Sequence, residues 1–128
     1  MIEVAAVILS DTRGKILICK RKEGGNCGGL WEFAGGKREP HEPMEVCAVR
    51  ECQEELGVSV SLDGIFDQYT FRYPEREIAF TFFLGHITEG VLQMRVHDGL
   101  CWVTREELAQ FDFCPADIAL VERLIQDK

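Results

Sequence analysis

Residues 43–57 constrain this chain more than any other stretch, because they predict one helix that carries several acids on a single side. Pro43 suits the first turn of a helix, and Gly57 is typical of the position just after the last turn. At about 100° of rotation per residue, the carboxylates of Glu51, Glu54 and Glu55 share an arc of about 100°. Like charges at these spacings repel one another, so a plain solvated face explains this helix poorly.

The same three acids form a set of hard oxygen donors that face one way. Mg²⁺ and Mn²⁺ prefer such donors, usually together with substrate phosphates. Arg50, four residues before Glu54, is the neighbouring cation. The core-facing side of the helix is expected to consist of Ala48, Val49, Cys52 and Leu56. The helix therefore predicts a divalent-cation site beside a packed face.

Around this helix the chain reads G-x5-E-x7-R-E-U-x-E-E-x-G-U, where U is a bulky apolar residue. The pattern is filled by Gly36, Glu42, Arg50, Glu51, Cys52, Glu54, Glu55, Gly57 and Val58. Its seven fixed identities have a chance probability on the order of 10⁻⁸ per starting position. This segment resembles the Nudix box. Cys52 departs from the aliphatic residue usual in the family, and a buried thiol can fill that place.

The resemblance covers nearly the whole chain and is weakest over residues 89–99. Outside the box, residues 20–21, 30–37, 73–76 and 115–117 are similar to MutT-type nucleoside triphosphate pyrophosphohydrolases. The fold implied by this resemblance is the α/β Nudix fold, an α/β/α sandwich with a central mixed sheet. Residues 1–128 would then form a single Nudix hydrolase domain.

The resemblance also implies an activity and its residues. It implies Mg²⁺-dependent attack of water on a phosphate chain, with Mn²⁺ as an alternative ion. Metal would be held by the Gly35 carbonyl, Glu51, Glu54 and Glu55. Arg50 would pair with a box carboxylate and orient it, and Glu42 would support the loop. Arg21 and Lys37 would meet phosphates, while the base pocket would be lined by Phe33, Arg76 and Asp117.

Plainer explanations of these side chains stay open. Phe33 is equally compatible with a core position, and Arg21 and Lys37 with solvated surface charges. Arg76 suits a hairpin turn, and Asp117 suits the first turn of a helix, where the dipole favours an acid.

One departure concerns the late strand. MutT-type enzymes commonly place a Glu before its tryptophan, whereas here Cys101 precedes Trp102. Either Asp98 substitutes for that Glu or a box glutamate activates water directly. His41, His86 and His97 are expected in surface or loop positions, with His97 the one able to approach the cleft.

Asp117 bears on the base that is read. An ionised carboxylate only accepts hydrogen bonds, so it suits N1–H and N2–H₂ of guanine or 8-oxoguanine, and N4–H₂ of cytosine. Residues 31–36 and 115–118 also resemble bacterial CTP pyrophosphohydrolases. The expected reaction converts (d)NTPs, such as 8-oxo-dGTP or CTP and dCTP analogues, to (d)NMP and pyrophosphate. The alternatives are hydrolysis of another nucleoside diphosphate-linked compound, or a non-catalytic nucleotide sensor.

The charge balance limits the partners. With 22 acids against 14 bases, the formal charge of −8 argues against coating a nucleic-acid polymer. The six cysteines form no C-x-x-C pair, and no stretch of the chain suits a signal peptide or a membrane span. We expect a reduced, cytoplasmic protein that binds a nucleoside triphosphate and no membrane, as a monomer or weak dimer.

Outside the box, apolar runs over residues 3–9 and 15–20 predict a hairpin of two buried strands. Further strands are expected over residues 58–62, 65–73, 77–87 and 100–103. The spacing of Thr104 and Glu107 predicts a capping box that opens a short helix. A last helix over residues 115–126 is expected to bury Ile118, Leu120, Val121, Leu124 and Ile125.

Overall fold

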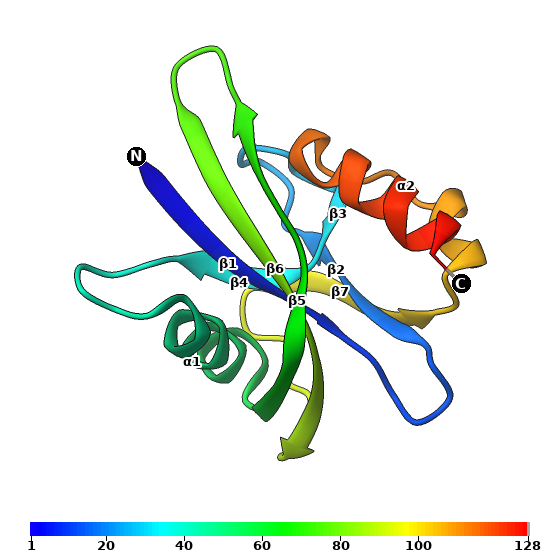
Figure 1. Ribbon diagram of the computed structural model, residues 1–128. Helices are drawn as coiled ribbons and strands as arrows, with labels where there is room; N and C mark the ends of the chain where they lie inside the picture. The colour runs from blue at the N-terminus through cyan, green and yellow to red at the C-terminus, as the bar shows by residue number, and fades with distance from the viewer. Residues whose placement is uncertain (128) are drawn as a thin grey trace.

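The computed structural model describes residues 1–127 and mixes strands with helices (Figure 1). The strands are β1 (Ile2–Leu9), β2 (Ile16–Arg21), β3 (Trp31–Glu32), β4 (Ala34–Lys37), β5 (Ser59–Arg72), β6 (Glu77–Glu89) and β7 (His97–Val103). The helices are α1 (Met44–Leu56) and α2 (Ile118–Gln126), with 3₁₀ turns η1 (Glu106–Gln110) and η2 (Pro115–Asp117). Helix α1 ends at Gly57, whose φ of 70° favours glycine and stops the helix as expected.

The strands form two sheets. A four-stranded mixed sheet has the order β4-β1-β6-β5, in which β1 and β6 are parallel and the other pairs are antiparallel. A smaller antiparallel sheet has the order β3-β2-β7. The predicted hairpin of residues 3–9 and 15–20 is therefore wrong, because β1 and β2 lie in different sheets. Within residues 1–127 a single bridge, between Ser10 and Ile16, pairs the two segments.

The central sheet lies between the two helices, so the predicted α/β/α sandwich is confirmed (Figure 1). Alternate residues of β1 point to opposite faces. One core packs β1 against α1, through Ala5, Val7, Leu9, Cys47, Ala48, Cys52 and Leu56. The other packs β1 near α2, through Ala6, Ile8, Phe82, Leu120, Val121 and Leu124. Because β1 is buried on both faces, its run is almost continuously apolar, as in parallel sheets.

Two expected core residues are exposed. Ile118 has 49% of its surface accessible, because η2 precedes it and it occupies the first position of a helix that begins later than predicted. Val49 is 36% accessible, since it lies at the edge of the buried side of α1. The buried side of α1 includes Cys47, which the helical arc had not assigned to the core.

Two further local predictions, the strands over residues 58–73 and the capping box at Thr104, have different outcomes. Strand β5 is continuous rather than two strands, because register shifts on either side of Gly64 keep it paired with β6. The capping box at Thr104 is confirmed: the Thr104 N–H donates to Glu107 Oε1 at 2.8 Å, and the Glu107 N–H to Thr104 Oγ1 at 3.2 Å. The turn that it opens, η1, is a 3₁₀ helix. Neither helix within residues 1–127 has the length and apolarity to cross a membrane.

Candidate active site

Arg50 draws together the acids of the box. Its Nε and Nη2 donate to the two carboxylate oxygens of Glu42 at 2.7 and 2.9 Å, a bidentate pair. Its Nη1 donates to Glu51 at 3.2 Å and to Glu54 at 3.1 Å, and Nη2 also reaches the Lys37 carbonyl at 3.1 Å. Hydrogen bonds from Arg50 and from the Glu39 N–H lower the pKa of Glu42 to about 2. One guanidinium thus ties the loop before α1 to the acidic side of the helix.

Glu51 and Glu55 face strand β4, Glu51 against Gly36 and Glu55 beside the Gly35 N–H. A Cβ atom at Gly36 would collide with the Glu51 carboxylate, which is 9% exposed as a residue. The Gly35 N–H donates to Glu55 Oε1 at 3.3 Å. Burial raises the pKa of Glu51, and burial together with the nearby charge of Glu32 raises the pKa of Glu55 to about 7. Both carboxyls therefore lie where a negative charge lacks full compensation.

The donors in this region fit a divalent cation by their chemistry, although they are not gathered around one point. Within residues 1–127, no three His, Cys, Asp or Glu side chains are close enough together to hold a metal ion. Glu51 and Glu54 nevertheless meet at the same Arg50 nitrogen, and Glu55 lies on the same helix beside Gly35. This is an excess of hard oxygen donors over cations, which is the environment that Mg²⁺ prefers.

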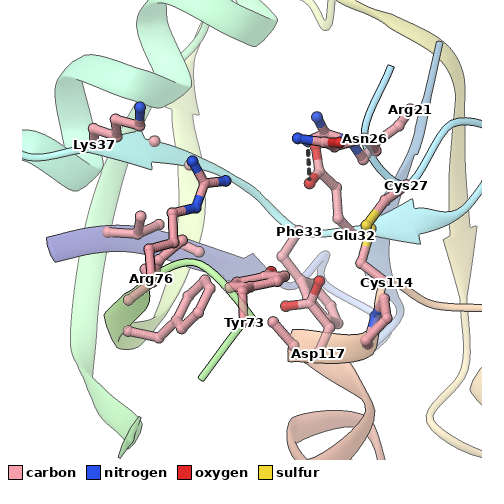
Figure 2. Close-up of a pocket in the computed structure, with 18 of the residues that line it drawn as sticks. Arg21, Asn26, Cys27, Glu32, Phe33, Lys37, Tyr73, Arg76, Cys114 and Asp117 are labelled. Atoms are coloured by element: carbon pink, nitrogen blue, oxygen red, sulfur yellow. Dashed lines mark hydrogen bonds and ion pairs between the residues drawn. The ribbon is translucent and has the colours of Figure 1, made fainter. Parts of the chain in front are cut away.

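A cavity of about 650 Å³ opens beside these carboxylates (Figure 2). Seven of the expected site residues line it: Arg21, Phe33, Gly35, Lys37, Glu55, Arg76 and Asp117. Lys37 and Arg76 lie at one side of the cavity in Figure 2, whereas Arg21 lies across from them. The walls between include the aromatic rings of Phe33, Tyr73, Phe80 and Phe82. The cavity therefore combines cationic edges with an apolar interior.

Three expected residues do not line this cavity: Arg50, Glu51 and Glu54. The Glu51 carboxylate lies directly against the backbone of Gly36. The Glu54 side chain is 57% exposed and pairs with Arg50 on the solvent side of α1. The sequence placed all three acids at one site, whereas in the structure Glu55 lines the cavity and Glu51 and Glu54 do not.

Asp117 closes one side of the cavity from η2. The Tyr69 hydroxyl donates to the Ala116 carbonyl at 2.5 Å and so holds the turn, while Phe33 stacks on Phe113 with centroids 5.7 Å apart. Asp117 is 7% exposed, and burial, followed by the charge of Glu32, raises its pKa to about 8. A carboxyl with this raised pKa favours its neutral form near pH 7, and a neutral carboxyl is able to donate as well as accept a hydrogen bond. Sequence reasoning treated Asp117 as ionised, whereas its burial favours the neutral carboxyl.

Sequence reasoning missed Glu32. It was wrong to expect His97 at the surface, whereas the expectation that His97 could approach the cleft agrees with its place in the wall of the smaller cavity. Glu32, which lies between Trp31 and Phe33 in the sequence, lines the cavity. Its Oε1 accepts a hydrogen bond from Arg21 Nη1 at 2.9 Å. His97 is 4% exposed rather than on the surface, and its Nε2 lies 3.0 Å from Glu32 Oε2. The one available signal was the alternation of Glu32 between aromatic residues. No local pattern marks His97.

Asp98 does not take the place of the glutamate expected before Trp102. Its side chain is exposed, and it is absent from the residues that line this cavity or the smaller one beside it. Cys101 is half-buried, and its thiol donates to the Trp102 carbonyl at 3.9 Å. Of the two alternatives open from the sequence, the geometry favours a box glutamate, since Glu55 lies in the cavity.

Comparison with known proteins agrees with this architecture. The NUDIX domain model matches residues 2–124. The CTP pyrophosphohydrolase of Escherichia coli is 39% identical over 122 residues, covering 95% of this chain and 90% of that protein. The 8-oxo-dGTP diphosphatase of Proteus vulgaris is 34% identical over 102 residues, covering 80% of this chain and 89% of that protein.

Solved structures give the same result. The solution structure of the Escherichia coli ORF135 protein superposes with a TM-score of 0.84 at 38% identity, covering 98% of this chain and 89% of that chain. A box of matching spacing, a sandwich fold and near full-length relatives therefore agree. This chain belongs to the Nudix family of hydrolases, enzymes that cleave phosphorus-containing anhydrides.

Proposed function

We propose that this protein hydrolyses (d)NTPs to (d)NMP and pyrophosphate in a Mg²⁺-dependent reaction that removes oxidised or modified nucleotides. One observation carries the proposal. A single cavity has the Glu55 carboxyl and Gly35 at one wall, Arg21, Lys37 and Arg76 at its edges, and aromatic rings with Asp117 inside. The cations suit a phosphate chain, the rings suit a base, and the acid suits a divalent ion between them.

The residues of the chain divide the work as follows. Gly35, Glu51, Glu54 and Glu55 would hold Mg²⁺, or Mn²⁺, which supplies charge neutralisation and a water of lowered pKa. Arg50 keeps Glu51 and Glu54 on one side of α1 through its Nη1, anchored in turn by the bidentate pair with Glu42. Lys37 and Arg76 lie across the cavity from Arg21, so a polyphosphate between them meets cations on both sides.

Asp117 bears on the base, because its burial in the cavity wall favours the neutral carboxyl. A neutral carboxyl can donate to N3 and accept from N4–H₂ of cytosine at once. It can equally donate to O6 and accept from N1–H of guanine or 8-oxoguanine. The similarity to an Escherichia coli protein named CTP pyrophosphohydrolase supports the first class, and the similarity to 8-oxo-dGTP diphosphatases supports the second. Both belong in the substrate panel.

The panel tests the reaction directly. It contains 8-oxo-dGTP, dGTP, CTP, dCTP, 5-substituted dCTPs, ADP-ribose and diadenosine polyphosphates, each assayed with Mg²⁺ for pyrophosphate and orthophosphate. We expect pyrophosphate from at least one triphosphate. Direct release of orthophosphate contradicts the proposal. If only ADP-ribose or diadenosine compounds are hydrolysed, the protein is a hydrolase of another nucleoside diphosphate-linked compound. If nucleotides bind but none is hydrolysed, the protein is a nucleotide sensor.

A matched pair of variants on α1 tests the metal assignment. Glu54→Gln removes a charge at the proposed ion, so we expect kcat to fall by about 10² to 10³-fold, several kcal/mol of transition-state stabilisation. Glu45→Gln removes an exposed acid in the first turn of the same helix and should leave kcat unchanged. Equal turnover by Glu54→Gln and the unmodified protein would show that the metal assignment is wrong.

The proposal extends to the setting of the enzyme. We infer a cytoplasmic protein, because all six cysteines are free thiols, which is typical of reducing compartments. We also infer that residues 1–128 form a single Nudix domain, since the family model matches residues 2–124. Its partner is a nucleoside triphosphate, without a nucleic-acid polymer or membrane. A monomer or weak dimer is expected, to be measured by light scattering.

A further inference from the structure

Three residues that are far apart in the sequence meet at one end of the small sheet. Arg21 ends β2, Glu32 ends β3 and His97 begins β7, and β2 is the middle strand. Arg21 lies opposite His97 in the register, beyond a bulge after Lys20. All three side chains line the smaller cavity, and Arg21 and Glu32 also line the main cavity next to it.

Glu32 is held from both sides. Its Oε1 accepts from Arg21 Nη1 at 2.9 Å, and its Oε2 accepts from His97 Nε2 at 3.0 Å. The Glu32 and His97 side chains are 20% and 2% exposed, so solvent screens their contact little. Because both carboxylate oxygens are engaged, Glu32 acts as a connection between two side chains and is poorly placed to bind a metal ion.

Burial of His97 costs free energy that packing alone does not explain. It is 4% exposed, and its Nδ1 is a buried polar atom without a hydrogen-bond partner among the described residues. Buried polar atoms are nearly always paired, so an unpaired one calls for a compensating role. Within residues 1–127, the one side-chain hydrogen bond that the ring makes is the contact with Glu32.

Arg21 has unused donors for a ligand. Its Nε donates to the Asn26 carbonyl at 2.9 Å, and its Nη1 donates to Glu32. Within residues 1–127, Nη2 has no protein partner, and Arg21 lines the cavity with Glu32 beside it (Figure 2). A guanidinium fixed along one edge presents its remaining N–H groups in a defined direction, which suits the oxygens of a phosphate.

We propose that His97 is a positioning residue, which fixes the Glu32 carboxylate and through it directs the Arg21 guanidinium toward the nucleotide. The inference rests on the proposed function, because Arg21 is assigned there to the phosphate chain. The Arg21 side chain is 39% exposed and long, so a carboxylate that is itself anchored reduces the freedom that binding would otherwise remove. His97 acts at a distance and touches no substrate atom.

Three substitutions at His97 separate this role from a structural one. His97→Leu removes the donor, His97→Gln places an amide nitrogen near the position of imidazole Nε2, and His97→Asn places it near Nδ1 instead. We expect His97→Leu and His97→Asn to raise KM for the triphosphate by about tenfold with kcat nearly unchanged, the pattern of lost ground-state binding. His97→Gln should recover most of the affinity.

The exposed pair of His86 and Asp63, with Nδ1 and Oδ2 2.8 Å apart, supplies a matched control away from the cavity. His86→Leu removes a similar contact and should leave KM unchanged. If His97→Leu does not fold, the comparison of Gln with Asn at the same position carries the test. Equal KM values for these two variants would overturn the proposal.

A double-mutant cycle with Arg21→Ala gives the decisive measurement. If His97 acts through Arg21, His97→Gln and His97→Asn should differ in the Arg21 background and should not differ once Arg21 is alanine. If the two variants still differ by the same factor in the Arg21→Ala background, the role proposed for His97 is contradicted while the proposed function is unaffected. If the unmodified protein hydrolyses no nucleotide, the proposed function fails instead, and the same cycle is measured as Kd for a non-hydrolysable CTP analogue.

Discussion

Asp117 is a buried acid whose proton makes the stability of the protein depend on pH. In the folded state its pKa is raised to about 8, mainly by burial and then by Glu32, whereas the ordinary value is 3.8. Between these values the folded state keeps a proton that the unfolded state has lost, so this group makes stability fall as pH rises. Below pH 4 the penalty is absent, and above pH 8 it is complete.

Asp117→Asn should remove this dependence, since the amide is never charged. We expect the Tm of the variant to match the unmodified protein near pH 4 and to exceed it by about 5 °C or more at pH 9, measured by scanning calorimetry. Asp112→Asn changes an exposed acid five residues away and should not alter the pH slope. A difference in Tm that is constant between pH 4 and pH 9 would contradict the raised pKa.

Some site contacts were predictable and others were not, for a physical reason. Arg50 and Glu54 are four residues apart on one helix, so their 3.1 Å contact follows from helical geometry. Glu32 and His97 are 65 positions apart and meet because both flank β2 in the small sheet. Strand pairing between distant segments leaves no local pattern, so this contact could not be found from the sequence.

At the scale of elements, β4 packs closely against both β1 and α1 through two adjacent glycines with different neighbours. A Cβ atom at Gly35 would lie 2.6 Å from the Ala6 Cα and would also collide with the Ala5 carbonyl, both backbone atoms of β1. A Cβ atom at Gly36 would instead meet the Glu51 carboxylate, the end of a side chain. Backbone can move less than a side chain, so the two positions should respond differently.

Gly35→Ala should therefore destabilise the fold by roughly 1–3 kcal/mol, the usual cost of overpacking, because it forces β4 away from β1. Gly36→Ala should cost less stability and displace Glu51, so that kcat falls while the urea midpoint changes little. The measurements are urea unfolding and steady-state kinetics on both variants. The opposite ranking, with Gly36→Ala the less stable variant, would show that Glu51 cannot move aside.

The elements themselves were largely predictable, and their partners were not. Helix α1 was located from Pro43, Gly57 and the spacing of its acids, and it runs over Met44–Leu56. The strand predicted to pair with β1 was wrong. Local turn chemistry at residues 11–14 favours a hairpin, but the apolar surface on both faces of β1 is buried better when the strand lies between β4 and β6. Tertiary burial therefore decided the pairing.

At the scale of the whole molecule, the net charge of −8 is unevenly distributed over the fold. Arg21, Lys37 and Arg76 line the cavity together with four acids, Glu32, Glu55, Glu75 and Asp117. Glu39, Glu42, Glu51 and Glu54 surround the single guanidinium of Arg50. Folding therefore concentrates carboxylates that the unfolded chain keeps apart. A divalent ion that binds there should stabilise the folded state selectively, because the unfolded chain does not present the same donors.

Added Mg²⁺ should accordingly raise Tm in a saturable way, with a stabilisation of about 2.7 kcal/mol at a concentration one hundred times Kd. The titration is made by scanning calorimetry at constant ionic strength, with NaCl replaced in step, because salt alone also screens repulsion between carboxylates. Glu51→Gln and Glu54→Gln should reduce the Mg²⁺-dependent rise, whereas Glu45→Gln should preserve it. If Mg²⁺ raises the Tm of all three variants by as much as it raises that of the unmodified protein, the ion binds elsewhere on the acidic surface and the box carboxylates do not bind it.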